Sequence, residues 1–94
     1  MSYRVIRPRT RRDANEGVIA AALRAAGART WELDQPFDLL TLYGGVFRLL
    51  EVKRPGEKPS ERQQELLGTL QALGAPVYVV RTPEDALQAI GAIR

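Results

Sequence analysis

Two carboxylates and a lysine, Asp38, Glu51 and Lys53, are the residues whose types and spacing most strongly suggest chemistry. They lie in two apolar runs, 37–43 and 46–53, which are joined by a pair of glycines and predict a β-hairpin with a two-residue turn. In this hairpin Asp38 stands opposite Glu51, with the Cβ atoms roughly 4.5–5.5 Å apart. Lys53 shares the face of Glu51 because strand side chains alternate. Opposed carboxylates destabilise a sheet unless a cation neutralises them, so the pattern predicts a divalent-cation site.

The chain contains no His and no Cys, which excludes several kinds of chemistry. Ser-His-Asp and Cys-His catalysis, a histidine general base, disulfides and ordinary zinc sites all need one of these two residue types. A metal ion would have to be held by oxygen ligands. Hard ions such as Mg²⁺ or Mn²⁺ prefer such ligands, so we expect one of these two ions.

A sequence of 94 residues with 45% hydrophobic residues is long enough for one small domain. Its first residues contain no apolar signal segment, and no run approaches the roughly 18 apolar residues of a membrane span. These features predict a cytoplasmic protein with no membrane partner. We expect a basic N-terminal arm over residues 1–12 and a single domain over residues 13–94.

Basic residues are concentrated in two places, although the formal net charge is only +3. One cluster lies in the N-terminal arm, and the other follows the second strand of the hairpin, next to the carboxylates. Arginine suits bidentate phosphate contacts, and clustered basic residues are typical of nucleic-acid-binding surfaces. For the arm alone, a solvated basic tail is an equally good interpretation. The residues expected to contact nucleic acid are Arg7, Arg9, Arg11, Arg12, Arg54, Lys58 and Arg62.

The patterns along the chain predict the element order αβββαβα. A helix between the hairpin and the last strand permits a parallel crossover, so we expect an α/β fold with a mixed sheet flanked by helices. The expected elements are helix 13–26, strand 30–33, the hairpin, helix 60–73, strand 77–80 and a last helix capped by Thr82 with Pro83 at its first position.

The apolar residues of these elements predict which side chains are buried. The run 77–80 is typical of a buried strand, and the aromatic residues Trp31 and Tyr78 are expected in the core rather than as platforms for stacked bases. Residues 49–52 also indicate a largely buried strand, which argues against Glu51 and Lys53 as a merely solvated edge. The side chains expected to point inward include Val18, Ile19, Leu23, Leu66, Leu67, Leu70 and Leu73 from the helices, together with Trp31 and Tyr78.

Five short segments occur in a fixed order with compatible spacing: Asn15-Glu16, Asp38-Leu39-Leu40, Leu50-Glu51-Val52-Lys53, Ser60-x-x-Gln63 and Tyr78-Val79-Val80-Arg81. This ordered set resembles the PD-(D/E)XK nuclease superfamily. Within that superfamily the chain is most similar to small stand-alone VRR-NUC nucleases, which are themselves similar to Holliday-junction resolvases. The family usually has Pro immediately before the Asp, whereas Phe37 separates Pro36 from Asp38 here.

The resemblance implies a restriction-endonuclease-like fold and a Mg²⁺-dependent endonuclease that hydrolyses phosphodiester bonds of DNA. Asp38, Glu51 and the backbone carbonyl of Val52 would hold the metal, and Lys53 would orient or help deprotonate the attacking water. A domain this small has little surface for reading bases in a groove, so we expect selection of DNA by structure, such as a junction or branch. Resolving a four-way junction takes two cuts and would require a homodimer.

Glu16 and Gln63 each have a structural and a functional interpretation. Glu16 could complete a capping box with Asp13, or it could extend toward the metal from the inward stripe of its helix. Gln63 could complete a capping box with Ser60, but its helical spacing also aims it at the sheet near the carboxylates. We expect Gln63 to contact a phosphate or the attacking water, whereas the two interpretations of Glu16 remain equally supported.

Two functions of other classes fit parts of the sequence. A non-catalytic nucleic-acid-binding subunit would keep the fold and the basic surface, and its salt-sensitive DNA binding would not depend on metal. A regulatory protein whose basic face meets an acidic protein partner would show no appreciable DNA affinity at physiological salt. The carboxylate pair favours the nuclease, because a binding protein gains nothing from two opposed carboxylates inside a basic surface.

Overall fold

The computed structural model describes residues 14–34 and 37–94, within which three helices and four strands follow one another in the predicted order. Every predicted boundary that falls within these residues agrees with the structure to within two positions. The elements are α1 (Ala14–Ala25), β1 (Arg29–Glu32), β2 (Leu39–Tyr43), β3 (Val46–Val52), α2 (Glu61–Ala72), β4 (Val77–Val80) and α3 (Pro83–Ala89).

A tight hairpin joins β2 to β3, as the two glycines predict. Gly44 and Gly45 have φ angles of 59° and 79°, in the left-handed region that glycine adopts without a steric penalty. Two successive positive values are typical of a type I′ turn, whose twist matches that of the flanking strands. The register that follows pairs Leu39 with Leu50 and confirms the predicted alignment of the strands.

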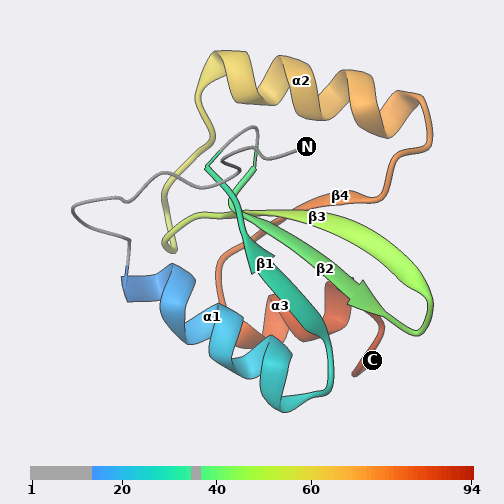
Figure 1. The fold of residues 1–94 in the computed structure, drawn as a ribbon. Coiled ribbons are helices and arrows are strands. Elements are labelled where there is room, and N and C mark those ends of the chain that lie inside the picture. The colour runs from blue at the N-terminus through green and yellow to red at the C-terminus, as the bar shows by residue number, and fades with distance from the viewer. Residues whose placement is uncertain (1–13, 35–36) are drawn as a thin grey trace, which may run out of the picture.

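The four strands form one mixed sheet in the order β1-β2-β3-β4 (Figure 1). The first three strands are antiparallel neighbours, whereas β3 and β4 run parallel. Parallel neighbours cannot be joined by a tight turn, so the chain crosses over through α2. The fold is therefore an α/β fold with a mixed sheet flanked by helices, as predicted, and β1 and β4 form the edges of the sheet.

Helices α1 and α3 lie on one side of the sheet, and α2 lies on the other (Figure 1). The main core forms where α1 and α3 meet the sheet, and each CH₂ group buried there contributes about 0.8 kcal/mol to stability. It contains Ile19, Ala20, Leu23, Ala28, Leu39, Leu50, Val52, Val80, Ala86 and Ile90.

The second, smaller core under α2 corrects part of the predicted helix packing. Leu67 packs there with Phe37 and Val77, but Leu66 is 39% exposed and Leu73 is 77% exposed, so the prediction that these two point inward was wrong. The packing of α2 is mainly against β4, and the small core takes Leu67 and Leu70 from this helix but neither Leu66 nor Leu73.

Three other residues predicted to be buried are also exposed. Val18 is 55% exposed, because the buried residues of α1 are Glu16, Ile19 and two others with helical spacing, a stripe that leaves Val18 to one side. Trp31 is 41% exposed and Tyr78 is 37% exposed. These two aromatic residues stand on β1 and β4, the outer strands of the sheet formed by the described residues, and no strand of that part of the chain lies beyond them.

The caps of α2 and α3 form as the sequence predicts. The Ser60 hydroxyl accepts a hydrogen bond from the Gln63 N–H at the start of α2, and the Thr82 hydroxyl accepts one from the Asp85 N–H at the start of α3. Pro83 occupies the first position of α3. None of the helices within the described residues is long and apolar enough to cross a membrane.

Candidate active site

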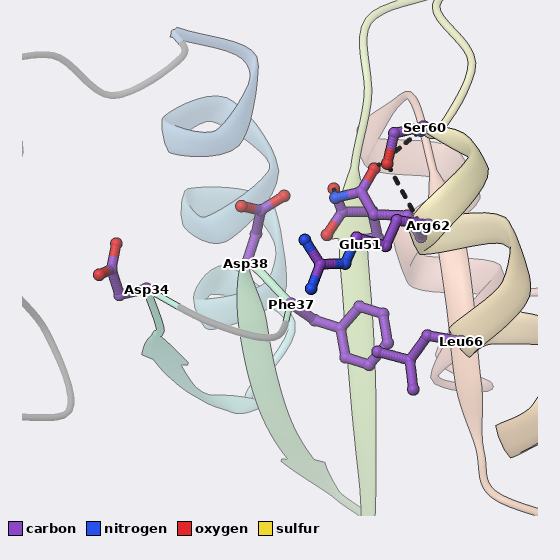
Figure 2. Close-up of a pocket in the computed structure, with 8 residues that line it drawn as sticks. Asp34, Phe37, Asp38, Glu51, Ser60, Arg62 and Leu66 are labelled. Carbon is purple, nitrogen blue, oxygen red and sulfur yellow. Dashed lines mark hydrogen bonds between the residues drawn. The ribbon is translucent and has the colours of Figure 1, made fainter.

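A hollow of about 730 Å³ opens where the start of β2 and the end of β3 meet the first turn of α2 (Figure 2). Both carboxylates predicted to face each other across the hairpin line this hollow, and so does the predicted glutamine of α2. The lining residues are Asp34, Phe37, Asp38, Glu51, Ser60, Arg62, Gln63 and Leu66.

Glu51 is the centre of the polar contacts in the hollow. Its side chain projects from β3, and only 3% of the residue is exposed. Lys53 Nζ lies 3.1 Å from Glu51 Oε2, and Gln63 Nε2 donates a hydrogen bond of 2.9 Å to the same oxygen. The structure therefore brings together Glu51 of β3 and Lys53 just after it, which strand alternation places on one face, and α2 adds Gln63 to them.

Asp38 reaches the site from the residue just before β2. Its N–H donates to the Leu50 carbonyl (3.1 Å), and its Oδ2 atom accepts a hydrogen bond of 2.8 Å from the Val52 N–H. These two bonds fix the carboxylate against β3. The strand pairing ends at Leu39 and Leu50, so Asp38 and Glu51 are not ladder partners, but the charge of Asp38 acts on Glu51 and the two carboxylates are close, as the hairpin predicts.

The electrostatic environment of Glu51 shows that the two carboxylates interact. Burial raises the pKa of Glu51 above its ordinary value of 4.5, and the negative charge of Asp38 raises it further. The contacts with Lys53 and Gln63 lower the pKa but do not outweigh the first two effects. The site thus places a carboxylate where its negative charge is unfavourable, as expected where a cation would complete the charge balance.

The backbone of Val52 faces the Asp38 side of β3. In a strand, the N–H and C=O of one residue point toward the same neighbouring strand. Because the Val52 N–H donates to Asp38, its carbonyl is directed to that side too, while the next residue, Lys53, donates its N–H to Val80 of β4. This orientation is compatible with the predicted role of the Val52 carbonyl as a metal ligand.

Gln63 completes the predicted capping box with one end of its side-chain amide and contacts Glu51 with the other. Its Oε1 accepts a hydrogen bond of 3.1 Å from the Ser60 N–H, which completes the capping box of α2. Its Nε2 group is thereby turned toward the sheet and donates to Glu51. The cap of the helix therefore determines which end of the amide reaches the carboxylate.

The basic residues predicted to contact nucleic acid are not all near this hollow. Arg62 is exposed and lines it, and Figure 2 shows the side chain extending from α2 toward Asp38. Lys58 is exposed in the loop before α2, where Arg54 Nε lies 3.8 Å from Glu57 Oε1. The predicted contacts Arg7, Arg9, Arg11 and Arg12 lie outside the described residues.

Asn15 is a positioning residue to which the sequence assigned no separate role. Its Nδ2 group donates hydrogen bonds of 3.0 Å to the carbonyls of Lys53 and Arg81, and so ties the first turn of α1 to the chain just after β3 and β4. The only signal in the sequence was its place beside Glu16. Glu16 is 2% exposed, and its role as a metal ligand stays a prediction, while its predicted capping partner, Asp13, lies outside the described residues.

The donor set suits a small, hard cation in type and charge. Two carboxylates and a backbone carbonyl are oxygen ligands of the kind that Mg²⁺ and Mn²⁺ prefer. The contacts given above engage Oδ2 of Asp38 and Oε2 of Glu51. Across residues 14–34 and 37–94, no three acidic side chains gather into a metal-holding group. A cation here would therefore complete its coordination with water, as Mg²⁺ commonly does.

Comparisons of the chain with family models, curated proteins and solved structures find no match. The chemistry of the site is therefore inferred from its own residues. They define a small α/β protein with a buried, partly neutralised glutamate, a second carboxylate opposite it, and an arginine at the rim.

Proposed function

We propose that this protein is a Mg²⁺- or Mn²⁺-dependent endonuclease that hydrolyses phosphodiester bonds of DNA, with a restriction-endonuclease-like core of the PD-(D/E)XK type. One observation carries the proposal: Lys53 and Gln63 converge on a single oxygen of the buried Glu51, and the charge of Asp38 acts on the same carboxylate. An ion pair that served only the fold would be more stable without the second carboxylate.

Asp38, Glu51 and the Val52 carbonyl would hold the metal ion. When bound, the ion would polarise the scissile phosphate and lower the pKa of a coordinated water molecule. In the metal-free protein a proton competes for Glu51, because the pKa of this carboxyl is raised. Metal binding is therefore expected to release a proton and to tighten as the pH rises.

Lys53 would supply positive charge beside the carboxylates. A protonated amine cannot be a metal ligand, and the contact of 3.1 Å with Glu51 holds it at the site with its side chain only 15% exposed. From there it can orient the attacking water and offset the negative charge that develops on the phosphate. The hydrogen bond from Asn15 to the Lys53 carbonyl holds the backbone that carries this side chain.

The substrate would be selected by its structure rather than by its base sequence. Arg62, exposed at the rim of the hollow, is placed to contact a phosphate near the one that is cleaved. The domain offers little surface for reading bases in a groove, which favours junction or branched DNA as the substrate. Two coordinated cuts in a four-way junction would require a homodimer.

The test combines calorimetric titration of Mg²⁺ and Mn²⁺ with cleavage of labelled junction, flap, single-stranded and duplex DNA. In Asp38→Asn the amide oxygen can still accept the Val52 hydrogen bond, so we expect the fold to persist while metal binding and cleavage are lost together. Lys53→Ala should keep metal binding but lose about 10²–10³-fold in cleavage rate, the usual effect of removing one electrostatic contact to the transition state.

Glu65→Gln is the matched control, because Glu65 is an exposed carboxylate of α2 outside the hollow. It should bind metal and cut DNA as the wild type does. Cleavage that survives in both Asp38→Asn and Lys53→Ala would overturn the proposal. Salt-sensitive DNA binding without metal binding or cleavage would instead support the non-catalytic nucleic-acid-binding subunit.

A further inference from the structure

The face of the sheet on the α2 side is covered unevenly. The small core under α2 is built on β3 and β4, whereas Trp31 of β1 is 41% exposed and Phe47 at the far end of β3 is 53% exposed. The strand register arranges this face in rows. One row contains Trp31, Leu40, Leu49 and Val77, and the next contains Arg29, Leu42 and Phe47.

Trp31 and Phe47 form an exposed aromatic pair across β2. Their ring centroids lie 6.3 Å apart, with an angle of 35° between the ring planes. The half-buried Leu40 and Leu42 lie between them on β2 and form an apolar floor. We call these four residues, Trp31, Leu40, Leu42 and Phe47, the aromatic platform.

The aromatic platform shares its face of the sheet with the carboxylate site. Phe47, Leu49 and Glu51 alternate along β3 and therefore project to the same side. At about 3.3 Å per residue, the row of Trp31 lies about 7 Å from the row of Glu51, and the row of Phe47 about 13 Å. An apolar groove of about 230 Å³ runs beside Phe47 toward the α2–β4 loop. A strand held at the carboxylates can therefore extend directly over the platform.

The charge of these rows favours a polyanionic occupant over a second copy of the chain. Arg29 is exposed in the row of Phe47, and none of the residues in the two rows is acidic. A second copy that packed this face against itself would bring the two Arg29 side chains to an interface whose rows offer no acidic residue to pair with them. A single nucleic-acid strand offers both phosphates for Arg29 and a flat π-face on every unpaired base for the aromatic rings.

We propose that the aromatic platform stacks unpaired bases of the DNA strand that is cut at the neighbouring carboxylates. The inference rests on the proposed nuclease function and deepens it by naming the part of the substrate that must be single-stranded. Bases within a duplex are stacked on one another and cannot lie on the protein. The platform therefore selects DNA that is unpaired on one side of the cut, such as a flap or a branch.

Trp31 is the only tryptophan of the chain and provides a direct probe. Metal-free wild type in EDTA is titrated with a short single-stranded oligothymidylate and, separately, with a duplex of the same length. We expect saturable quenching of Trp31 fluorescence by the single strand and none by the duplex. Because the protein contains no metal, this readout does not depend on cleavage.

Leucine variants separate stacking from general apolar contact. Phe47→Leu and Trp31→Leu keep an apolar side chain but remove the ring, and each should weaken binding of the labelled single strand by roughly tenfold or more, as expected for loss of base stacking. Tyr78→Leu is the matched control, since Tyr78 is an aromatic residue of similar exposure (37%) paired with Leu50 on the opposite face. Its affinity should be unchanged.

Several outcomes would contradict the proposal that the aromatic platform stacks unpaired bases. These are single-strand binding without Trp31 quenching, equal quenching by the duplex, wild-type affinity in both leucine variants, or sedimentation that shows a dimer with Trp31 buried between the copies. The proposed nuclease function is tested by a different readout, the cleavage of DNA. Quenching with no cleavage in Mg²⁺ or Mn²⁺ would retain the platform and reject the nuclease, whereas cleavage without quenching would do the reverse.

Discussion

The two faces of the sheet differ in how completely they are covered and in the charge they carry. Under α1 and α3, the strand residues Leu39, Leu50 and Val80 are at most 2% exposed and pack against apolar helix residues. Under α2, the same strands present Glu51, Lys53 and a partly open apolar surface. The difference shows that a domain of this size can concentrate its packing on one face and leave the other available for charged groups.

The largest expected difference between the two faces is in stability. Leu23→Ala, in the core under α1 and α3, should lower the free energy of unfolding by about 2–5 kcal/mol, because it leaves a cavity at a fully buried position. Leu73→Ala, on the 77% exposed end of α2, should change it by less than about 0.5 kcal/mol. Urea unfolding followed by circular dichroism measures both, and equal losses would remove the contrast between the faces.

The second prediction concerns how stability depends on pH through Glu51, on the face of the sheet under α2. The raised pKa of Glu51 means that the folded protein keeps a proton above pH 4.5 in a range where the unfolded chain has lost it. The free energy of unfolding of the metal-free wild type should therefore fall as the pH rises through this range. Glu51→Gln cannot titrate, so its stability relative to the wild type should increase over the same range. Unfolding curves for both proteins at a series of pH values test this.

Metal should stabilise the wild type more than it stabilises Glu51→Gln. Mg²⁺ at about a hundred times its dissociation constant would stabilise the wild type by about 2.7 kcal/mol, because it binds only the folded state. Glu51→Gln lacks one of the proposed ligands and should gain much less. Thermal melts with Mg²⁺ and with EDTA provide the measurement, and an equal gain in both proteins would contradict the proposed ligand set.

A smaller effect on stability is expected at Gln63, where α2 contacts Glu51. Gln63→Ala removes half of the capping box and one hydrogen bond to Glu51, and should lower the free energy of unfolding by about 1–2 kcal/mol. Gln63→Glu keeps a residue that can complete the capping box but places a second carboxylate beside Glu51. Its stability should match that of the wild type in acid and fall below it as the pH rises, and no such divergence would show that Gln63 serves only the cap.

The smallest expected effect is on DNA binding by Arg62, at the rim of the hollow. Arg62→Gln should weaken DNA binding uniformly across sequences and reduce the slope of log affinity against log salt by about one, the value for one lost phosphate contact. Arg94→Gln, which removes an exposed arginine from the end of the chain beyond α3, is the control. Fluorescence anisotropy at several salt concentrations distinguishes them, and identical slopes would show that Arg62 does not contact phosphate.

Local features of the sequence were enough to predict the ends of the elements and the hairpin register. Gly44-Gly45 determined which residues stand opposite each other, and Thr82 and Ser60 marked the starts of two helices. These features depend on residues only a few positions apart, so no knowledge of the rest of the fold was needed. The approach of Asp38 to Glu51 followed from this local reasoning.

Burial on the α2 side could not be predicted in the same way. Leu66 and Leu73 have the helical spacing of core residues, but α2 packs mainly against β4, and only Leu67 and Leu70 of this helix join the small core. Trp31 is exposed because it stands on an edge strand, which follows from the strand order and not from its own neighbours in the chain. Asn15 bonds carbonyls 38 and 66 residues away, a separation over which sequence pattern alone carries little information.

By itself, the sequence determined the element order, the hairpin that opposes Asp38 to Glu51, and the absence of His and Cys that leaves only oxygen ligands for a metal ion. The sequence also aimed Gln63 at the carboxylates, but only the tertiary structure decided that it donates to the same Glu51 oxygen that Lys53 contacts and that an aromatic surface stays open on the same face. The reason is physical: periodicity and turn chemistry act over a few residues, whereas the docking of a helix on a sheet depends on all the elements at once.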